Sequence, residues 1–300
     1  MKIKDVLARD GVSVSLEVFP PKKEESLARM RGVIERLCRQ RPSFMSVTFG
    51  AAGGRDAHTA DVAALIEAQG VTALAHQTCV GCPPAEVRDR LAHLRDIGVE
   101  NVLALRGDLP AGAAAPPDGH FAHASDLVRE IRAFGGFCIG GACYPEVHPE
   151  SLNSDDDIRR LREKVDAGLD FLTTQMFFDN ALFYRFLWKA REAGIHVPVV
   201  AGIMPVTSGS QVGRIRALSG SYLPHRFMSL VDKWGGNPAA MEQAGVAYAT
   251  DQIVDLLANG VRAIHIYTMN KPSVAEAILA NLSQLLAPPA PPPGVTTTPA

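Results

Sequence analysis

The chain has 300 residues, of which 47% are hydrophobic and 21% charged, a composition typical of a globular protein. Its net charge of -2 and pI near 6.5 argue against a nucleic-acid partner, because binding phosphate backbones requires clustered positive charge. No apolar run approaches the roughly 20 residues that span a bilayer, and Met1–Gly11 lacks the apolar core of a secretory signal. We therefore expect a cytoplasmic protein that does not engage a membrane.

Short β-rich apolar runs recur along the chain, each followed by a polar or glycine-rich turn and then a stretch of helical periodicity. The expected strands are Val12–Phe19, Phe44–Phe49, Val71–Cys79, Asn101–Leu105, Phe137–Tyr144, Phe171–Phe178, Val197–Met204 and Ala263–Thr268. Several of them are almost continuously hydrophobic, as is typical of parallel strands that are covered on both faces.

Amphipathic stretches lie between these strands. The expected helices are Ser26–Gln40, Asp61–Gln69, Pro84–Ile97, Ser125–Phe134, Asp155–Ala167, Ala181–Ala193 and Ala244–Asn259. Five of them end at a glycine just before the next strand, namely Gly70, Gly98, Gly168, Gly194 and Gly260. Eight strands with regular helical crossovers predict an α/β fold, a single-domain (β/α)8 TIM barrel over residues 1–286. The proline-rich segment 287–300 cannot pack a core and is predicted to be a disordered tail.

In such a barrel the C-terminal ends of the strands share a common mouth, where polar side chains serve catalysis or binding. The expected strand ends carry Glu17, Thr48, His76, Thr78, Arg106, Asp108, Tyr144, Glu146, His148, Gln175, Tyr267 and Asn270. Glu17 lies between two apolar residues, so burial should raise its pKa, which suits a general acid working near neutral pH. The alternative is a buried structural salt bridge, with Arg106 as a candidate partner.

Two of these strand ends concentrate functional groups. In residues 105–108, a glycine lets a ligand approach the backbone and Arg106 offers a fork suited to phosphate, although an Arg-Gly-Asp run also fits an ordinary solvated turn. In residues 144–150, two prolines stiffen a loop that holds an aromatic residue, a histidine and two acids, which favours a site. Residues 154–157 resemble a capping box that opens a helix, which is a structural reason for their acids.

Cys79 and Cys82 form a C-x-x-C pair with His76 nearby, which raises the alternative of a metal site. A structural zinc site needs two further ligands at suitable spacing, so we predict no metal and interpret the five cysteines as reduced, buried side chains.

The chain has no G-x-G-x-x-G turn, Walker loop or G-x-S-x-G elbow. A nucleotide-type ligand would therefore be held by the barrel mouth itself.

Taken together and in order, eight motifs resemble those of the methylenetetrahydrofolate reductases of the bacterial single-domain kind. They are Glu17-Val18-Phe19-Pro20-Pro21, Ser46-Val47-Thr48-Phe49-Gly50-Ala51, Arg106-Gly107-Asp108-Leu109-Pro110, Tyr144-Pro145-Glu146-Val147-His148-Pro149, Lys164-Val165-Asp166-Ala167-Gly168, Gln175-Met176-Phe177-Phe178-Asp179, Gly202-Ile203-Met204-Pro205 and Tyr267-Thr268-Met269-Asn270. The resemblance implies a homo-oligomeric barrel that binds FAD and reduces 5,10-methylenetetrahydrofolate to 5-methyltetrahydrofolate with NADH or NADPH, in one-carbon and methionine metabolism.

The resemblance also implies roles for individual residues. Glu17 would deliver a proton to nitrogen 10 of the folate and help to open its imidazolidine ring, and Asp108 would favour the resulting cationic iminium. Substrate would be bound by Gln175, Tyr144, Gln211 and Lys271. FAD would be lined by Thr48, His76, Leu105, Arg106, Gly107, Asp108, His123, Ala142, Tyr144, His148, Asp157 and Lys164. Within that set, Arg106 and Lys164 have the charge to meet a pyrophosphate.

Five positions depart from the pattern of the best-known enterobacterial members of the family: His123, Arg160, Glu163, Ile215 and Lys271. Glu163 removes a positive charge near the expected phosphates, although a neighbouring arginine restores one. Lys271 keeps a charge but loses the bidentate fork of the arginine that it replaces.

Two other functions remain open from the sequence. One is a metal-dependent barrel hydrolase that uses His76, Cys79, Cys82 and Asp108. The other is a catalytically silent barrel that serves as a partner subunit, against which the intact Glu17, Asp108 and Gln175 argue.

Overall fold

The computed structural model describes residues 1–21, 26–49, 58–109, 116–117 and 119–287. Parallel strands form a closed barrel in the order β1-β2-β3-β4-β5-β6-β7-β8, and pairing of β1 with β8 closes it. The strands are β1 (Ser13–Val18), β2 (Phe44–Val47), β3 (Ala73–Thr78), β4 (Asn101–Leu105), β5 (Cys138–Cys143), β6 (Phe171–Thr174), β7 (Val199–Ile203) and β8 (Ala263–Tyr267). Each lies within the range expected for it, and the predicted (β/α)8 TIM barrel is confirmed.

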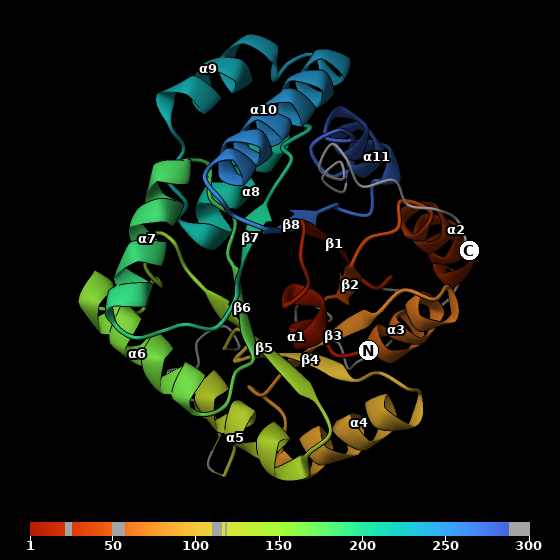
Figure 1. Cartoon of the computed structure of the whole chain (residues 1–300), viewed down its shortest axis with the longest axis vertical. Coiled ribbons are helices and arrows are strands. Elements are labelled where there is room, and N and C mark those ends of the chain that lie inside the picture. The colour runs from red at the N-terminus through yellow and green to blue at the C-terminus, as the bar shows by residue number, and fades with distance from the viewer. Residues whose placement is uncertain (22–25, 50–57, 110–115, 118, 288–300) are drawn as a thin grey trace, which may run out of the picture.

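Every helix except α1 lies on the outside of the ring of strands (Figure 1). The helices are α1 (Ile3–Leu7), α2 (Leu27–Cys38), α3 (Thr59–Ala68), α4 (Pro84–Asp96), α5 (Ala124–Phe134), α6 (Ser154–Asp166), α7 (Asn180–Glu192), α8 (Ser210–Ser219), α9 (His225–Trp234), α10 (Pro238–Ala258) and α11 (Pro272–Asn281). All of the expected helices are present. Helices α1, α8, α9 and α11 were not predicted, and α10 begins earlier than expected.

Two helix starts differ from the sequence prediction because an asparagine caps each of them. The side chain of Asn237 accepts a hydrogen bond from the backbone of Ala240 at 3.2 Å, and Pro238 follows in the first turn, where no N–H is needed. Helix α6 is capped by Asn153, whose Oδ1 accepts from two backbone N–H groups at 3.0 Å each. The expectation that Ser154 caps this helix is therefore wrong by one residue.

The interior of the barrel is divided into an apolar lower layer and a polar upper layer. Alternate residues of each strand face inward, and those near the strand starts form a cluster consisting of Phe44, Leu74, Leu103, Cys138, Phe171 and Val200, closed by Ile3 of α1. In Figure 1, α1 lies across the middle of the ring. Two residues further along the strands, Ser46 and His76 occupy the inward positions after Phe44 and Leu74, so that the barrel becomes polar toward its mouth.

Helices α8, α9 and α10 pack on one another at the side of the barrel that follows β7. Their shared core consists of Phe178, Val206, Val212, Ile215, Phe227, Met241 and Tyr248. Helix α10 approaches the backbone after β7 so closely that a Cβ on Gly245 would lie 1.9 Å from the carbonyl oxygen of Val206. Within the described residues, no helix has the length and apolar character to cross a membrane. The predicted disordered tail lies outside them from residue 288 onward.

Candidate active site at the barrel mouth

The carboxylate of Glu17 is surrounded by side chains from three neighbouring strands. Its Oε2 accepts a hydrogen bond from the Ser46 hydroxyl at 3.1 Å and lies 3.3 Å from Nε2 of His265 and 3.4 Å from Nε2 of His76. The other ring nitrogen of His265, Nδ1, lies 2.8 Å from the hydroxyl of Ser15. The buried salt bridge to Arg106 considered as an alternative does not form; the partners of Glu17 are histidines and a serine.

The expectation that the pKa of Glu17 is raised is wrong. Burial does raise the pKa, but the hydrogen bond with His265, the nearby charges of His76 and His265, and the Ser46 hydroxyl outweigh burial and leave the pKa of Glu17 below its ordinary value. Burial lowers the pKa of His76 to about 4, more than the nearby Glu17 raises it. At neutral pH we therefore expect His76 to be neutral and the negative charge of Glu17 to be stabilised mainly by hydrogen bonds.

The end of β1 is fixed by residues that follow β8. The hydroxyl of Thr268 donates to the carbonyl oxygen of Glu17 at 2.6 Å. The side-chain amide of Asn270 pairs with the backbone of Phe19, accepting from its N–H at 3.0 Å and donating to its carbonyl at 2.9 Å. These bonds hold the backbone of Glu17 rigidly relative to His265.

Residues expected to line the cofactor gather around a cavity of about 270 Å³ between the ends of β4 and β5 and the start of α6. Seven of the twelve expected residues line it: Arg106, His123, Ala142, Tyr144, His148, Asp157 and Lys164. The ammonium of Lys164 donates to the carbonyl oxygen of Ala142, and burial lowers its pKa. The Tyr144 ring stands edge-on to the imidazole of His148, with 4.6 Å between their centroids.

Arg106 is already engaged by a carboxylate. Its Nη1 and Nη2 donate to the two oxygens of Glu150 at 2.5 and 2.7 Å, a bidentate pair on the rim of the same cavity. This partner was not predicted from the sequence. A phosphate that uses the same two donors must compete with Glu150.

The other residues expected to line the cofactor lie along the strand ends. Thr48 accepts a hydrogen bond at its carbonyl from the Thr59 hydroxyl at 3.1 Å, and Asp108 is exposed to solvent. Gly107 has a φ of 84°, and a Cβ there would lie 3.0 Å from Cβ of Thr78, so this turn requires glycine. Leu105 is the last residue of β4.

Two of the expected substrate-binding residues, Gln211 and Lys271, share one partner. Oε1 of Gln211 accepts from the backbone N–H of Thr207 at 2.9 Å, and the ammonium of Lys271 donates to the Thr207 hydroxyl at 2.9 Å. Thr207, which the sequence analysis missed, thus links α8 to the start of α11. The third, Gln175, lies after β6, where its Oε1 accepts from the next backbone N–H at 2.9 Å. The fourth, Tyr144, belongs to the cavity described above.

The positions that depart from the family pattern have local partners. Arg160 pairs with Asp156 at 3.0 Å and Glu163 with Arg159 at 2.5 Å, so the negative charge of Glu163 is balanced next to the cavity. His123 caps α5, and its backbone N–H donates to Asp126 at 3.0 Å. The structure buries Ile215 in the core shared by α8, α9 and α10.

All five cysteines are buried and none forms a disulfide bond, as expected. Burial is the main cause that raises the pKa of Cys79 to about 12, which opposes formation of a metal-binding thiolate. Its thiol lies 3.6 Å from the carbonyl oxygen of Arg106 and 3.7 Å from that of His123. In the part of the chain that is described, no three His, Cys, Asp or Glu side chains are placed to hold a metal ion.

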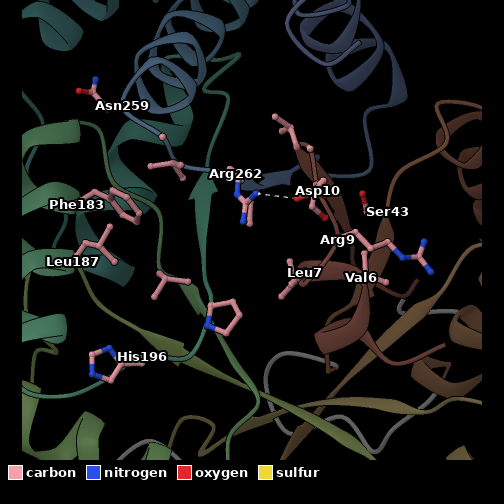
Figure 2. Close-up of a pocket in the computed structure, with 18 of the residues that line it drawn as sticks. Val6, Leu7, Arg9, Asp10, Ser43, Phe183, Leu187, His196, Asn259 and Arg262 are labelled. Atoms are coloured by element: carbon pink, nitrogen blue, oxygen red, sulfur yellow. Dashed lines mark ion pairs between the residues drawn. The ribbon is translucent and has the colours of Figure 1, made fainter. Parts of the chain in front are cut away.

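A second cavity, of about 460 Å³, lies at the opposite end of the barrel, where β1, β7 and β8 begin. Figure 2 shows Arg262 and Asp10 facing each other there, with Phe183, Leu187 and His196 to one side. The two charged groups are 3.9 Å apart and largely exposed. Because the N-terminal end of a TIM barrel contributes to stability and its C-terminal end carries the chemistry, we assign the active site to the mouth around Glu17.

Comparison with known proteins identifies the family of the chain. The family described as Methylenetetrahydrofolate reductase matches residues 2–283. The 5,10-methylenetetrahydrofolate reductase of Escherichia coli (strain K12) is 34% identical over 272 residues, which cover 90% of each chain. Methylenetetrahydrofolate reductase (NADH) 1 of Arabidopsis thaliana is 34% identical over 295 residues, but the chain spans only about half the length of this relative.

A solved structure supports the fold. An uncharacterized protein from Clostridium thermocellum, described as binding two copies of 5-methyl-5,6,7,8-tetrahydrofolic acid, superposes with a TM-score of 0.65 at 16% identity and covers 94% of this chain and 98% of its own. At this identity the likeness concerns the fold alone. The family match over nearly the whole chain and the bacterial relative carry the conclusion: the chain belongs to the methylenetetrahydrofolate reductase family.

Proposed function

We propose that this protein is a flavin-dependent reductase that converts 5,10-methylenetetrahydrofolate to 5-methyltetrahydrofolate with NADH or NADPH. The observation that carries the proposal is the partly buried carboxylate of Glu17 beside His265 at the barrel mouth. Family membership supports the substrate, and the plant relatives named as NADH enzymes support NADH as the donor.

Glu17 and His265 are arranged to hold one transferable proton. The Ser15 hydroxyl donates to the carbonyl oxygen of Ile264 at 3.2 Å, so its lone pairs are free to accept from Nδ1–H of His265. We propose that the transferred proton is held at the contact between Nε2 of His265 and Oε2 of Glu17, which lie 3.3 Å apart. The pair therefore donates a proton even though the pKa of Glu17 alone is lowered.

In the proposed reaction, this proton goes to nitrogen 10 of the folate. Protonation at nitrogen 10 breaks the bond between that nitrogen and the bridging methylene, and the electron pair of nitrogen 5 forms the iminium that accepts hydride. Asp108 supplies a negative charge on the solvent side of the same mouth, which favours a cation there. Gln175, Tyr144, Gln211 and Lys271 are proposed to orient the folate, with Thr207 fixing the last two.

The residues around the 270 Å³ cavity fit FAD, which carries hydride between the nicotinamide and the folate when it is bound. The buried Lys164 ammonium uses one of its three N–H donors on Ala142 and directs a positive charge into the cavity. Arg106 brings a second cation to its rim. These two cations are proposed to hold the pyrophosphate, and Thr48, His76, Leu105, Gly107, His123, His148 and Asp157 are proposed to line the rest of the cofactor.

We further propose a cytoplasmic homo-oligomer. Five buried cysteines that form no disulfide bond support a reducing compartment. The homo-oligomer rests on the family resemblance.

Three measurements on the purified protein test the proposal. A flavin absorbance spectrum, oxidation of NADH or NADPH with menadione as acceptor, and formation of 5-methyltetrahydrofolate should all be positive. Stoichiometric zinc without flavin would instead favour the metal-dependent hydrolase, and failure to bind either flavin or folate would favour the silent partner subunit.

A further inference from the structure

Glu146 lies in the loop between β5 and α6, two residues after Tyr144 and two before His148. Its Oε2 accepts a hydrogen bond from the backbone N–H of Tyr222 at 2.5 Å. Its Oε1 is buried and has no hydrogen-bond partner within the described structure. A carboxylate oxygen that is buried without a hydrogen bond destabilises the folded protein. Stability alone therefore does not explain the glutamate at this position.

The residue after Glu146 is strained. Val147 has a φ of 84°, in the left-handed region that a β-branched side chain rarely adopts, and such a conformation costs on the order of 1–3 kcal/mol. The strained residue turns the chain so that Glu146 reaches Tyr222 while His148 returns to the ring of Tyr144, at 4.6 Å between centroids. The contacts on the two sides of Val147 therefore hold the strained turn in place.

The segment that Glu146 contacts belongs to a neighbouring part of the mouth, after β7. It follows α8, which carries Gln211, and the Ser221 hydroxyl donates to the carbonyl oxygen of Met176 at 3.4 Å, next to Gln175. Residues 219–222 are thus attached both to the cofactor-side loop after β5 and to the folate-side loop after β6.

We propose that Glu146 is a positioning residue that joins the cofactor side of the mouth to its folate side by accepting the Tyr222 N–H and holding the strained turn at Val147. It acts through geometry: the length of its side chain and an acceptor oxygen are required, and its negative charge is not. It does not line the 270 Å³ cavity itself. The assignment of the two sides rests on the proposed function; the mechanical link between the two segments does not.

Two substitutions separate length from charge. Glu146→Asp keeps the charge but shortens the side chain by one methylene, so it no longer reaches the Tyr222 N–H. Glu146→Gln removes the charge but keeps an oxygen at the same distance. Glu130→Ala, which breaks a carboxylate–arginine pair with Arg88 on the outer helices, is the matched control.

The first readout is hydrogen–deuterium exchange of the free protein. We expect Glu146→Asp to accelerate exchange at least tenfold in both residues 144–150 and residues 219–223, whereas Glu146→Gln and Glu130→Ala stay within twofold of the unmodified protein. Exchange that is unchanged in Glu146→Asp, or accelerated equally in Glu146→Gln, overturns the proposal.

The second readout is ligand binding, measured as the dissociation constant of FAD for the apoprotein and as KM against kcat for folate. We expect Glu146→Asp to raise both the FAD dissociation constant and the folate KM about tenfold, which is about 1.4 kcal/mol each, with kcat within twofold, and Glu146→Gln to restore both. A lower melting temperature with unchanged binding would mean a merely structural role and overturn the proposal. If the unmodified protein reduces no folate, the proposed function is wrong. The hydrogen–deuterium exchange of the variants still tests whether Glu146 connects residues 144–150 to residues 219–223.

Discussion

Oε2 of Glu17 on β1 and Nε2 of His265 on β8 lie 3.3 Å apart, although 248 residues separate them along the chain. The contact exists because β1 and β8 pair in register, with Ser15 opposite His265 and Glu17 opposite Tyr267. The inward-facing side chains of both strands are thereby stacked at the same depth of the barrel. This pairing brings the Glu17 carboxylate within hydrogen-bonding distance of the His265 ring.

Replacing Glu17 by glutamine tests the proton-donor assignment. Glutamine keeps the size and the hydrogen bond from Ser46 but carries no transferable proton, so we expect folate reduction to fall by about 10²–10⁴-fold, the usual contribution of general acid catalysis. Oxidation of NADH with menadione should stay within twofold, because it needs no proton at nitrogen 10. Glu276→Gln, which alters a surface pair with Arg36, is the control. Normal folate reduction by Glu17→Gln would show that the acid lies elsewhere.

Glu150 is predicted to weaken cofactor binding by occupying Arg106. The pair is bidentate, but Glu150 is 58% exposed, so breaking it costs no more than about 1 kcal/mol. Glu150→Gln should therefore tighten FAD binding by up to roughly fivefold, measured by fluorescence titration of the apoprotein. The effect should shrink as salt is raised, because salt screens the exposed pair. Weaker FAD binding in Glu150→Gln would mean that the carboxylate contributes to the cofactor site.

His76 is predicted to make the fold sensitive to acid. Its pKa is lowered from 6.5 to about 4 in the native state, so between these values the unfolded chain takes up a proton that the native protein excludes. The stability present above pH 6.5 is then lost as the pH falls toward 4, by about 3 kcal/mol in total. Urea unfolding at pH 7 and pH 5 should show a smaller loss for His76→Asn than for the unmodified protein. The exposed His196→Asn should behave like the unmodified protein, and equal losses in all three would contradict the assignment.

The close contact between Gly245 and Val206 predicts that residue 245 does not tolerate a side chain. An alanine Cβ at residue 245 would lie 1.9 Å from a backbone carbonyl oxygen, so α10 must move away from the segment after β7. We expect Gly245→Ala to lower the free energy of unfolding by about 3 kcal/mol or more. At Gly32, in the middle of α2, no described atom beyond the helix's own backbone lies within 4 Å of the position that an alanine Cβ would take, and Gly32→Ala should raise stability by up to about 1 kcal/mol. Similar effects of the two substitutions would contradict the packing argument.

The barrel could be predicted because the sequence patterns that indicate its strands and helices lie within short segments of the chain. Runs of β-branched residues, helix periodicity and closing glycines are properties of short windows, and they placed every strand. The polar strand ends followed from the same windows, since Glu17 and Arg106 stand beside apolar runs. The strand residue His265 also interrupts an apolar run, Ile264 to Ile266, which is the signal that would have found it.

What the sequence could not reveal depends on contacts between distant segments. The pKa direction of Glu17 was predicted wrongly because burial can be read from neighbours in sequence, whereas the compensating hydrogen bonds come from Ser46 and His265. The partner of Arg106 is 44 residues away, and Glu150 could not be singled out among the acids of its loop. The short helix α1 was missed because five residues are too few to show a helical period.

Closure of the ring has a consequence for the order of events during synthesis. Of the strands, β1 leaves the ribosome first and β8 last, so Glu17 is made early and waits for His265 until the other strands have emerged. A growing chain therefore carries Glu17 without its neighbour His265. If the two residues deliver the proton as proposed, folate reduction requires the final strand to dock, and chains that end before β8 are expected to be inactive.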